Sequence, residues 1–204
     1  MFKKLFYSKH LHSFVEQAGT SGFALISFII LARVLSMEDF GQWTLYLTLL
    51  TFLDMIKFGF AKTALIKYSS GVKTEQKKEL IGSSWLLNLL SVVLISITTY
   101  FVYFLNFFET EGVVLFLLIY PIYSLLSMPY YYFLWNHQVL LEFNKIAFVR
   151  MFNSFLFLLT CLGSLYISIN LKELVIIHMS VFGTSSFLAL FLGNTGYNYI
   201  FKST

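Results

Sequence analysis

The sequence of 204 residues is poor in charge, since only 12% of its residues are Asp, Glu, Lys or Arg. Soluble domains carry about 25% charged residues and about 45–50% apolar ones, whereas 58% of this chain is hydrophobic. Too few polar side chains remain to cover a water-facing surface, which excludes a soluble enzyme or a free nucleic-acid-binding domain. The composition therefore predicts an integral membrane protein.

Cysteine, proline and catalytic motifs are scarce as well. Cys161 is the single cysteine, so no intrachain disulfide can form. Pro121 and Pro129 fall in one predicted helix, where each removes a backbone hydrogen bond and favours a kink. The sequence has no Walker loop and no HExxH, GxSxG or CxxC motif, and neither His137 nor His178 has a second ligand at metal spacing. We therefore expect no enzymatic activity, no cofactor and no metal site.

Stretches without any charged residue are long enough to cross a bilayer, which takes about 20 apolar residues in a helix. Four such stretches comprise residues 80–108, 112–141, 151–171 and 174–201. Two further apolar segments near the amino terminus are interrupted by charges. We predict an all-α membrane protein with one membrane domain over residues 1–204, a bundle of six helices that cover residues 14–35, 40–61, 83–105, 112–134, 148–169 and 174–193.

The predicted connections differ in charge. Ser36 and Asp39 fit a capping box in a sharp acidic turn, and the connections at 106–111 and 170–173 are short and mostly acidic. Residues 62–82 are predicted to form a basic linker that ends in a helix start at Thr74 and Glu75. Residues 135–147 are predicted to form an amphipathic turn of helix at the membrane interface rather than a free loop.

Positive residues then predict the orientation, because they are retained on the cytoplasmic side. Only Arg33 and Lys172 belong to the side with the short acidic connections, and Lys57 lies within a span. The other eleven share the opposite side, which predicts that both termini face the cytoplasm. These are Lys3, Lys4, Lys9, Lys62, Lys67, Lys73, Lys77, Lys78, Lys145, Arg150 and Lys202.

Asp54 and Lys57 are charged residues inside the second predicted span. Counted from Phe40, Asp54 lies about 21 Å into a hydrocarbon core about 30 Å thick, and the i,i+3 spacing places Lys57 on the same helix face. Charges at this depth are costly and commonly functional. One interpretation is a proton- or cation-sensitive carboxylate beside a lysine that can meet an anionic headgroup. The alternative is that the two neutralise each other while Lys57 extends to the surface.

Three other charged residues lie near span ends: Glu16 and Arg33 on the first helix and Arg150 on the fifth. Arg33 and Arg150 are either functional or simply anchors at headgroup depth. Polar residues at helical spacing on four helices either surround a water-filled cavity or simply permit close helix packing. They are Glu16, Thr20 and Ser27; Thr44, Thr48, Thr51 and Asp54; Ser84, Asn88, Ser91 and Thr98; and Arg150, Ser154, Cys161, Ser164 and Ser168.

Residues 31–41 (LARVLSMEDFG), followed by Asp54, Gly59 and Phe60, resemble the polysaccharide transporter family. These are the bacterial O-antigen and exopolysaccharide flippases, relatives of multidrug extruders and peptidoglycan lipid flippases. The basic segment after the second span and residues 141–145 (LEFNK) are similar to this family as well. The resemblance implies alternating-access transport of an undecaprenyl-diphosphate-linked oligosaccharide across the cytoplasmic membrane, coupled to an ion gradient or the membrane potential.

The resemblance also implies roles and partners. Lys57, Arg33 and Arg150 become candidate substrate-binding residues, and Asp54 and Glu16 candidate ion-coupling carboxylates. Such transporters have two six-helix lobes with a cationic cavity between them, so this chain resembles the amino-terminal lobe. The expected partners are the lipid-linked oligosaccharide, membrane lipids and a second six-helix lobe from the same or another chain, and no nucleic acid. Two alternatives remain open: a lobe of a small-molecule extruder, and a non-transporting membrane protein that binds a partner subunit.

Overall fold

The structure is a computed structural model that describes residues 9–202 except 70, 73 and 194. Lys3, Lys4 and Lys73, which contribute to the predicted orientation, lie outside the described residues. Within these limits the chain forms α-helices, one short 3₁₀-helix and no strand. They are α2 (Lys9–Val34), α3 (Met37–Ser69), α4 (Thr74–Phe104), α5 (Glu111–Val139), α6 (Phe143–Gly163), α7 (Leu171–Leu192) and η1 (Tyr197–Lys202).

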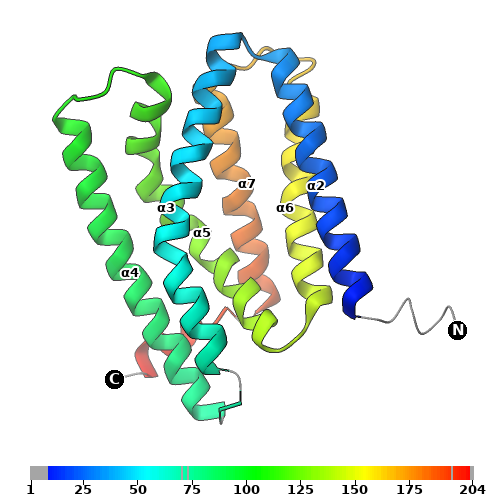
Figure 1. Cartoon of the computed structure of the whole chain (residues 1–204), viewed down its shortest axis with the longest axis vertical. Coiled ribbons are helices and arrows are strands. Elements are labelled where there is room, and N and C mark those ends of the chain that lie inside the picture. The colour runs from blue at the N-terminus through cyan, green and yellow to red at the C-terminus, as the bar shows by residue number, and fades with distance from the viewer. Residues whose placement is uncertain (1–8, 70, 73, 194, 203–204) are drawn as a thin grey trace, which may run out of the picture.

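Five helices, α2, α4, α5, α6 and α7, are long and apolar enough to cross a membrane. Helix α3, which carries Asp54 and Lys57, runs the height of the bundle beside the others (Figure 1). Large hydrophobic side chains are exposed along the outer surface, and a surface of this kind marks contact with a membrane. The prediction of an all-α, multi-pass membrane protein is confirmed.

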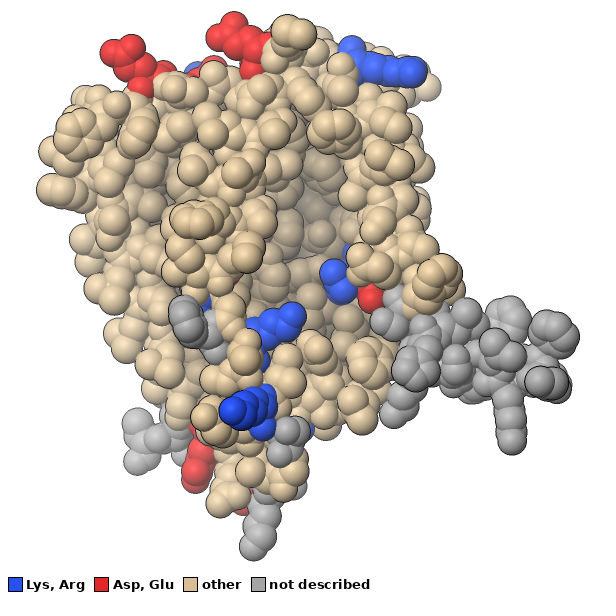
Figure 2. Space-filling view, in the orientation of Figure 1, with Lys and Arg blue, Asp and Glu red and all other residues tan. Residues whose placement is uncertain are grey.

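The connections alternate between the two ends of the bundle (Figure 1). Helix α2 begins, and η1 lies, at the end that also holds the α3–α4 and α5–α6 connections. We call this the basic end, because Lys67, Lys77, Lys78 and Lys145 lie on the adjoining helix ends. The opposite, acidic end carries Glu38, Asp39, Glu109, Glu111 and Glu173, and Figure 2 shows acidic side chains gathered at the top.

Both short connections at the acidic end that precede α3 and α7 are capped. The Asp39 amide donates to Ser36 Oγ at 3.0 Å, and that hydroxyl donates to Asp39 Oδ2 at 2.9 Å, in the turn that the sequence predicts. At α7, Asn170 and Glu173 form a complete capping box, which satisfies amides that the helix leaves without partners. The prediction of a loop at residues 170–173 is therefore wrong, because Asn170 caps α7 and residues 171–173 form its first turn.

The connections at the basic end are shorter than predicted. Helix α3 continues to Ser69, so the first part of the basic linker predicted over 62–82 is helix, whereas α4 begins at Thr74, where the sequence predicts a helix start. Residues 62–69 contain no proline or glycine, and lysine is a good helix former whose side chain extends into water. Helix α5 likewise continues to Val139, and only residues 140–142 separate it from α6.

Helix α5 lies at the centre of the bundle and packs on α3, α4 and α7. Its close approach to α3 depends on Gly112, whose amide donates to Gln42 Oε1 at 2.8 Å. A Cβ at this glycine would lie 2.5 Å from the Gln42 carbonyl oxygen. Tyr120 and Tyr123 are almost completely buried toward the middle of α5, so this packing brings phenolic hydroxyl groups to α3.

Candidate functional site

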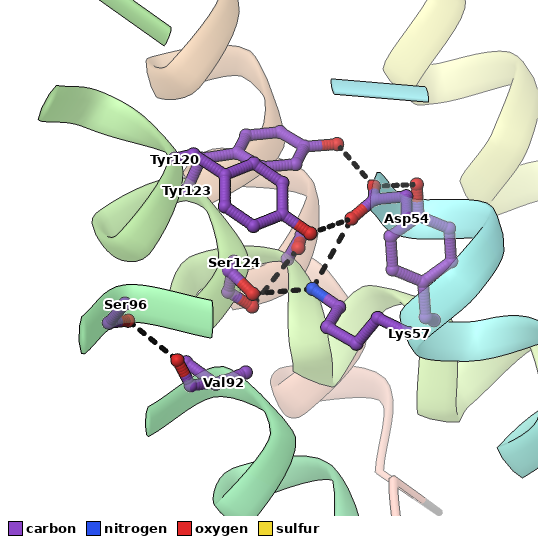
Figure 3. A network of polar contacts seen from close by, with 9 residues as sticks. Asp54, Lys57, Val92, Ser96, Tyr120, Tyr123 and Ser124 are labelled. Atoms are coloured by element: carbon purple, nitrogen blue, oxygen red, sulfur yellow. Dashed lines mark hydrogen bonds and ion pairs between the residues drawn. The ribbon is translucent and has the colours of Figure 1, made fainter. Parts of the chain in front are cut away.

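A buried ion pair lies at the contact between α3 and α5 (Figure 3). Lys57 Nζ is 3.3 Å from Asp54 Oδ1, and the two residues are only 5% and 8% exposed. The same ammonium donates to Ser124 Oγ at 2.5 Å and lies 3.9 Å from the centre of the Phe58 ring. The two charges therefore neutralise each other as the alternative interpretation expects, but Lys57 turns inward to Ser124 and does not extend to the surface.

Three tyrosine hydroxyls of α5 complete the surroundings of the carboxylate. Tyr120 donates to Asp54 Oδ1 at 3.1 Å, and Tyr131 and Tyr123 donate to Oδ2 at 3.3 and 3.4 Å. Hydrogen bonds to an ionised group are stronger than neutral ones, and a buried ion pair is tolerated only when its remaining polar atoms are satisfied. The cage of Tyr120, Tyr123 and Tyr131 thus permits a charged pair within the apolar bundle.

Asp54 also lies in the wall of a cavity of about 630 Å³ between α3, α5, α6 and α7. Aromatic rings form much of the wall, and Lys62, Gln138 and Arg150 supply polar groups toward the basic end. Figure 2 shows a hollow in this face, with basic side chains along its lower rim. The lining residues include Thr51, Phe58, Tyr123, Tyr130, Tyr131, Trp135, His178 and Phe182.

A second ion pair lies at the rim of this cavity. Arg150 Nη1 of α6 is 2.6 Å from Glu16 Oε1 of α2, and their side chains are 40% and 8% exposed. Both residues are candidate site residues in the sequence analysis, but their contact was not predicted, because it depends on the packing of α2 along α6. The guanidinium therefore faces the cavity while it contacts an almost buried carboxylate.

The remaining predicted residues do not share this cavity. Arg33 is exposed in the last turn of α2 at the acidic end, about 25 Å along the helix from Glu16 at 1.5 Å per residue. Lys57 lines a different hollow of about 400 Å³, on the α4 side of α3, together with Asn88 and Ser91. Of the three candidate anion contacts, Arg150 lines the main cavity, Lys57 lines the hollow beside α4, and Arg33 lines neither.

The polar residues of α4 do not line the main cavity either. Ser84 Oγ is 2.8 Å from the Tyr132 hydroxyl, to which Asn88 Nδ2 donates at 2.7 Å. These contacts join α4 to the far side of α5. The polar faces of the helices thus meet different partners and do not surround one common cavity.

Two residues that line the cavity, Lys62 and His178, were not predicted as site residues from the sequence. Lys62 follows Asp54 and Phe58 at intervals of four residues, so it lies on the same face of α3, but the predicted helix ended one residue before it. His178 is enclosed by the rings of Trp43, Tyr123 and Phe182, and its Nδ1 has no hydrogen-bond partner among the described residues. No group of three His, Cys, Asp or Glu in the described part of the chain could hold a metal.

The α5–α6 turn is fixed by charges outside the apolar segments. Glu142 Oε2 is 3.0 Å from Lys145 Nζ and 2.5 Å from His137 Nδ1. The hydrogen bond from Lys145 and, to a smaller extent, the one from His137 lower the pKa of the Glu142 carboxyl from its ordinary value of 4.5. The turn that brings α6 and Arg150 to the cavity is therefore held by an ionised glutamate.

Comparison with known proteins identifies a family model that matches most of the chain. The family model described as "Polysaccharide biosynthesis protein" matches residues 9–202. No curated protein and no solved structure matches the chain.

Proposed function

The chain belongs to the polysaccharide biosynthesis protein family, and we propose that it carries an undecaprenyl-diphosphate-linked oligosaccharide across the cytoplasmic membrane of a bacterium. The observation that carries this proposal is the cavity of about 630 Å³, which combines cations at its rim with an aromatic wall. Its volume lies within the range of about 300–1,000 Å³ that is typical of ligand pockets.

Each part of such a substrate matches a part of the structure. A diphosphate is an anion that Lys62 and Arg150 can bind, and a guanidinium matches phosphate oxygens with paired donors. Sugar rings have apolar faces that pack on aromatic rings such as Tyr131 and Trp135, and hydroxyl edges that the tyrosine hydroxyls and Gln138 can bind. The lipid chain would remain outside, against the exposed apolar surface of the bundle.

The charge distribution supports entry from the cytoplasmic side. The basic end carries most of the positive residues, which favours the cytoplasm for that end, and both rim cations lie toward it. In this proposal both termini are cytoplasmic. A second six-helix lobe, from the same or another chain, would close the open side of the cavity and permit alternating access.

Asp54 supports coupling of transport to a cation. Its carboxylate lies in the cavity wall, within reach of a proton or metal cation that enters, and among the residues that the structure describes Lys57 is the cation that balances its charge. Loss of that charge would release Lys57 and weaken three tyrosine hydrogen bonds at once. In the proposal this ion pair is the element through which an ion gradient acts on the α3–α5 contact.

Extrusion of organic cations is the less favoured function. A carboxylate among aromatic rings attracts cations, and Asp54 lies in such surroundings. However, Lys57 already neutralises this carboxylate at 3.3 Å, Glu16 balances the charge of Arg150 at 2.6 Å, and the charge of Lys62 at the rim would repel a cation. The net charge of the cavity therefore favours an anionic substrate.

A binding experiment tests the proposal. The protein in lipid nanodiscs is titrated with a short-chain polyprenyl diphosphate linked to a sugar, and with the matching uncharged glycolipid. Arg150→Gln and Lys62→Gln should each weaken binding of the diphosphate by roughly 10- to 100-fold, because a hydrogen bond to a charged group contributes about 1.5–3 kcal/mol. Lys172→Gln, at a residue exposed at the acidic end, is the matched control and should leave binding unchanged.

Two results would contradict the proposal. One is equal affinity for the diphosphate and the uncharged glycolipid. The other is binding of the diphosphate that neither Arg150→Gln nor Lys62→Gln weakens. Displacement of the ligand by a lipophilic organic cation such as tetraphenylphosphonium would favour the extruder instead.

A further inference from the structure

Arg150 is the cavity cation whose charge is already balanced within the protein. Its Nη1 is 2.6 Å from Glu16 Oε1, while two-fifths of its side chain stays exposed. A guanidinium has five N–H donors in a plane, so the contact with Glu16 leaves donors that can face the cavity. The Glu16 carboxylate thus lies against the guanidinium, where an oxygen atom of a bound anion would find its strongest partner.

The burial of Glu16 strengthens the effect of its charge on an anion that binds Arg150. Its side chain is only 8% exposed, so water screens its charge weakly. An anion that binds Arg150 beside this carboxylate meets a like charge, and like charges placed close together at an interface oppose binding. Binding then requires either that Glu16 withdraws from Arg150 or that the two anions share the guanidinium.

We propose that Glu16 is an internal competitor for Arg150, and that it must release the guanidinium when the phosphate of the substrate binds. The proposal rests on the proposed function, because it assumes that this cavity takes an anionic lipid. Glu16 is then a residue that sets selectivity and affinity: it keeps weakly charged anions away from Arg150, and a diphosphate with several negative charges displaces it. The release of Glu16 also loosens a contact between α2 and α6 when substrate binds.

A role of Glu16 as a structural link or as a positioning group for Arg150 makes the opposite prediction. If Glu16 only held Arg150 in place, its neutralisation would weaken anion binding. If it competes, neutralisation strengthens binding, because Glu16→Gln keeps the size of the side chain and a carbonyl acceptor for Arg150 while it removes the charge. The direction of the change therefore separates the two roles.

The experiment measures the affinity of undecaprenyl diphosphate and of undecaprenol, its uncharged counterpart, for the protein in nanodiscs. Glu16→Gln should bind the diphosphate roughly tenfold more tightly than the wild type, as expected for removal of a like charge, and should bind undecaprenol equally well. Glu16→Asp retracts the carboxylate by one methylene, so its gain should be smaller, and it gives a second reading if the glutamine variant folds poorly. Glu111→Gln removes a carboxylate that is 3.6 Å from Lys172 at the acidic end and should change neither affinity.

The outcomes separate this inference from the proposed function. Diphosphate binding that depends on Arg150 but is unchanged or weakened in both Glu16 variants would overturn the competitor role and leave the proposed function intact. Binding of the diphosphate by Glu16→Gln but not by the wild type would support the competitor role strongly. If neither protein prefers the diphosphate to undecaprenol, both proposals fail.

Discussion

The Asp54–Lys57 pair permits a stability prediction with a magnitude. At 3.3 Å and an effective dielectric constant of about 20, the attraction between the charges is about 5 kcal/mol, which offsets the cost of removing both from water. Lys57→Met leaves the carboxylate with hydroxyl donors but no cation, and Asp54→Asn leaves the ammonium without its counter-charge. Breaking a buried pair in this way costs about 3–5 kcal/mol, so each single variant should lose stability by about that amount.

The double variant Asp54→Asn/Lys57→Met is the informative one. Replacement of a whole buried pair by uncharged residues is often nearly neutral, so the double variant should recover most of the loss. Unfolding of the purified protein in mixed micelles with increasing SDS measures these free energies. Lys172→Met breaks an exposed pair and is the control, with an expected change of about 0–1 kcal/mol. Losses in the two single variants that simply add in the double variant would refute the pairing argument.

Two further predictions concern the packing and the turns. Gly112→Ala should destabilise the protein by about 1–3 kcal/mol, because its Cβ would collide with the Gln42 carbonyl; Gly22→Ala, where nothing lies within 4 Å, should be neutral or slightly stabilising in the same SDS titration. Because Lys145 lowers the pKa of Glu142 in the folded protein, the ionised carboxylate stabilises the fold above pH 4.5, and this contribution is lost as pH falls through the lowered pKa. Wild type and Glu142→Gln should therefore differ in stability at neutral pH and converge in acid, whereas a difference independent of pH would contradict this explanation.

The local features of the fold were predictable from sequence. Apolar length determines a membrane span, and the Ser36–Asp39 turn depends on side chains three residues apart, so both follow from neighbouring residues. The full length of α3 was not predicted. Exposed lysines on a helix that continues beyond the apolar segment give the same sequence pattern as lysines in a linker. For this reason Lys62 was not predicted as a site residue, because it shares a helix face with Asp54 only if α3 continues beyond residue 61.

The candidate site was predictable only in part. The Asp54–Lys57 contact follows from i,i+3 spacing within one helix, but the tyrosine cage depends on which face of α5 packs on α3, more than sixty residues away. Glu16 and Arg150 meet for the same reason, through the packing of α2 on α6. Charge near a span end is also produced by anchoring alone, so Arg33 could not be distinguished from Arg150 before the helices were placed.

In the proposed function, the cavity of α3, α5, α6 and α7 is accessible to water from the cytoplasmic side and holds the charged part of a lipid-linked sugar. The chain has one cysteine, so in a Cys161→Ser background single cysteines can be introduced at Thr51 and Gln138 in the cavity and at Ser91 in the hollow beside α4. In inside-out membrane vesicles, a membrane-impermeant maleimide should label the first two positions faster than the third, and a polyprenyl diphosphate-linked sugar should protect only those two. Cavity cysteines that react no faster than the one at position 91, or that the substrate does not protect, would contradict the account.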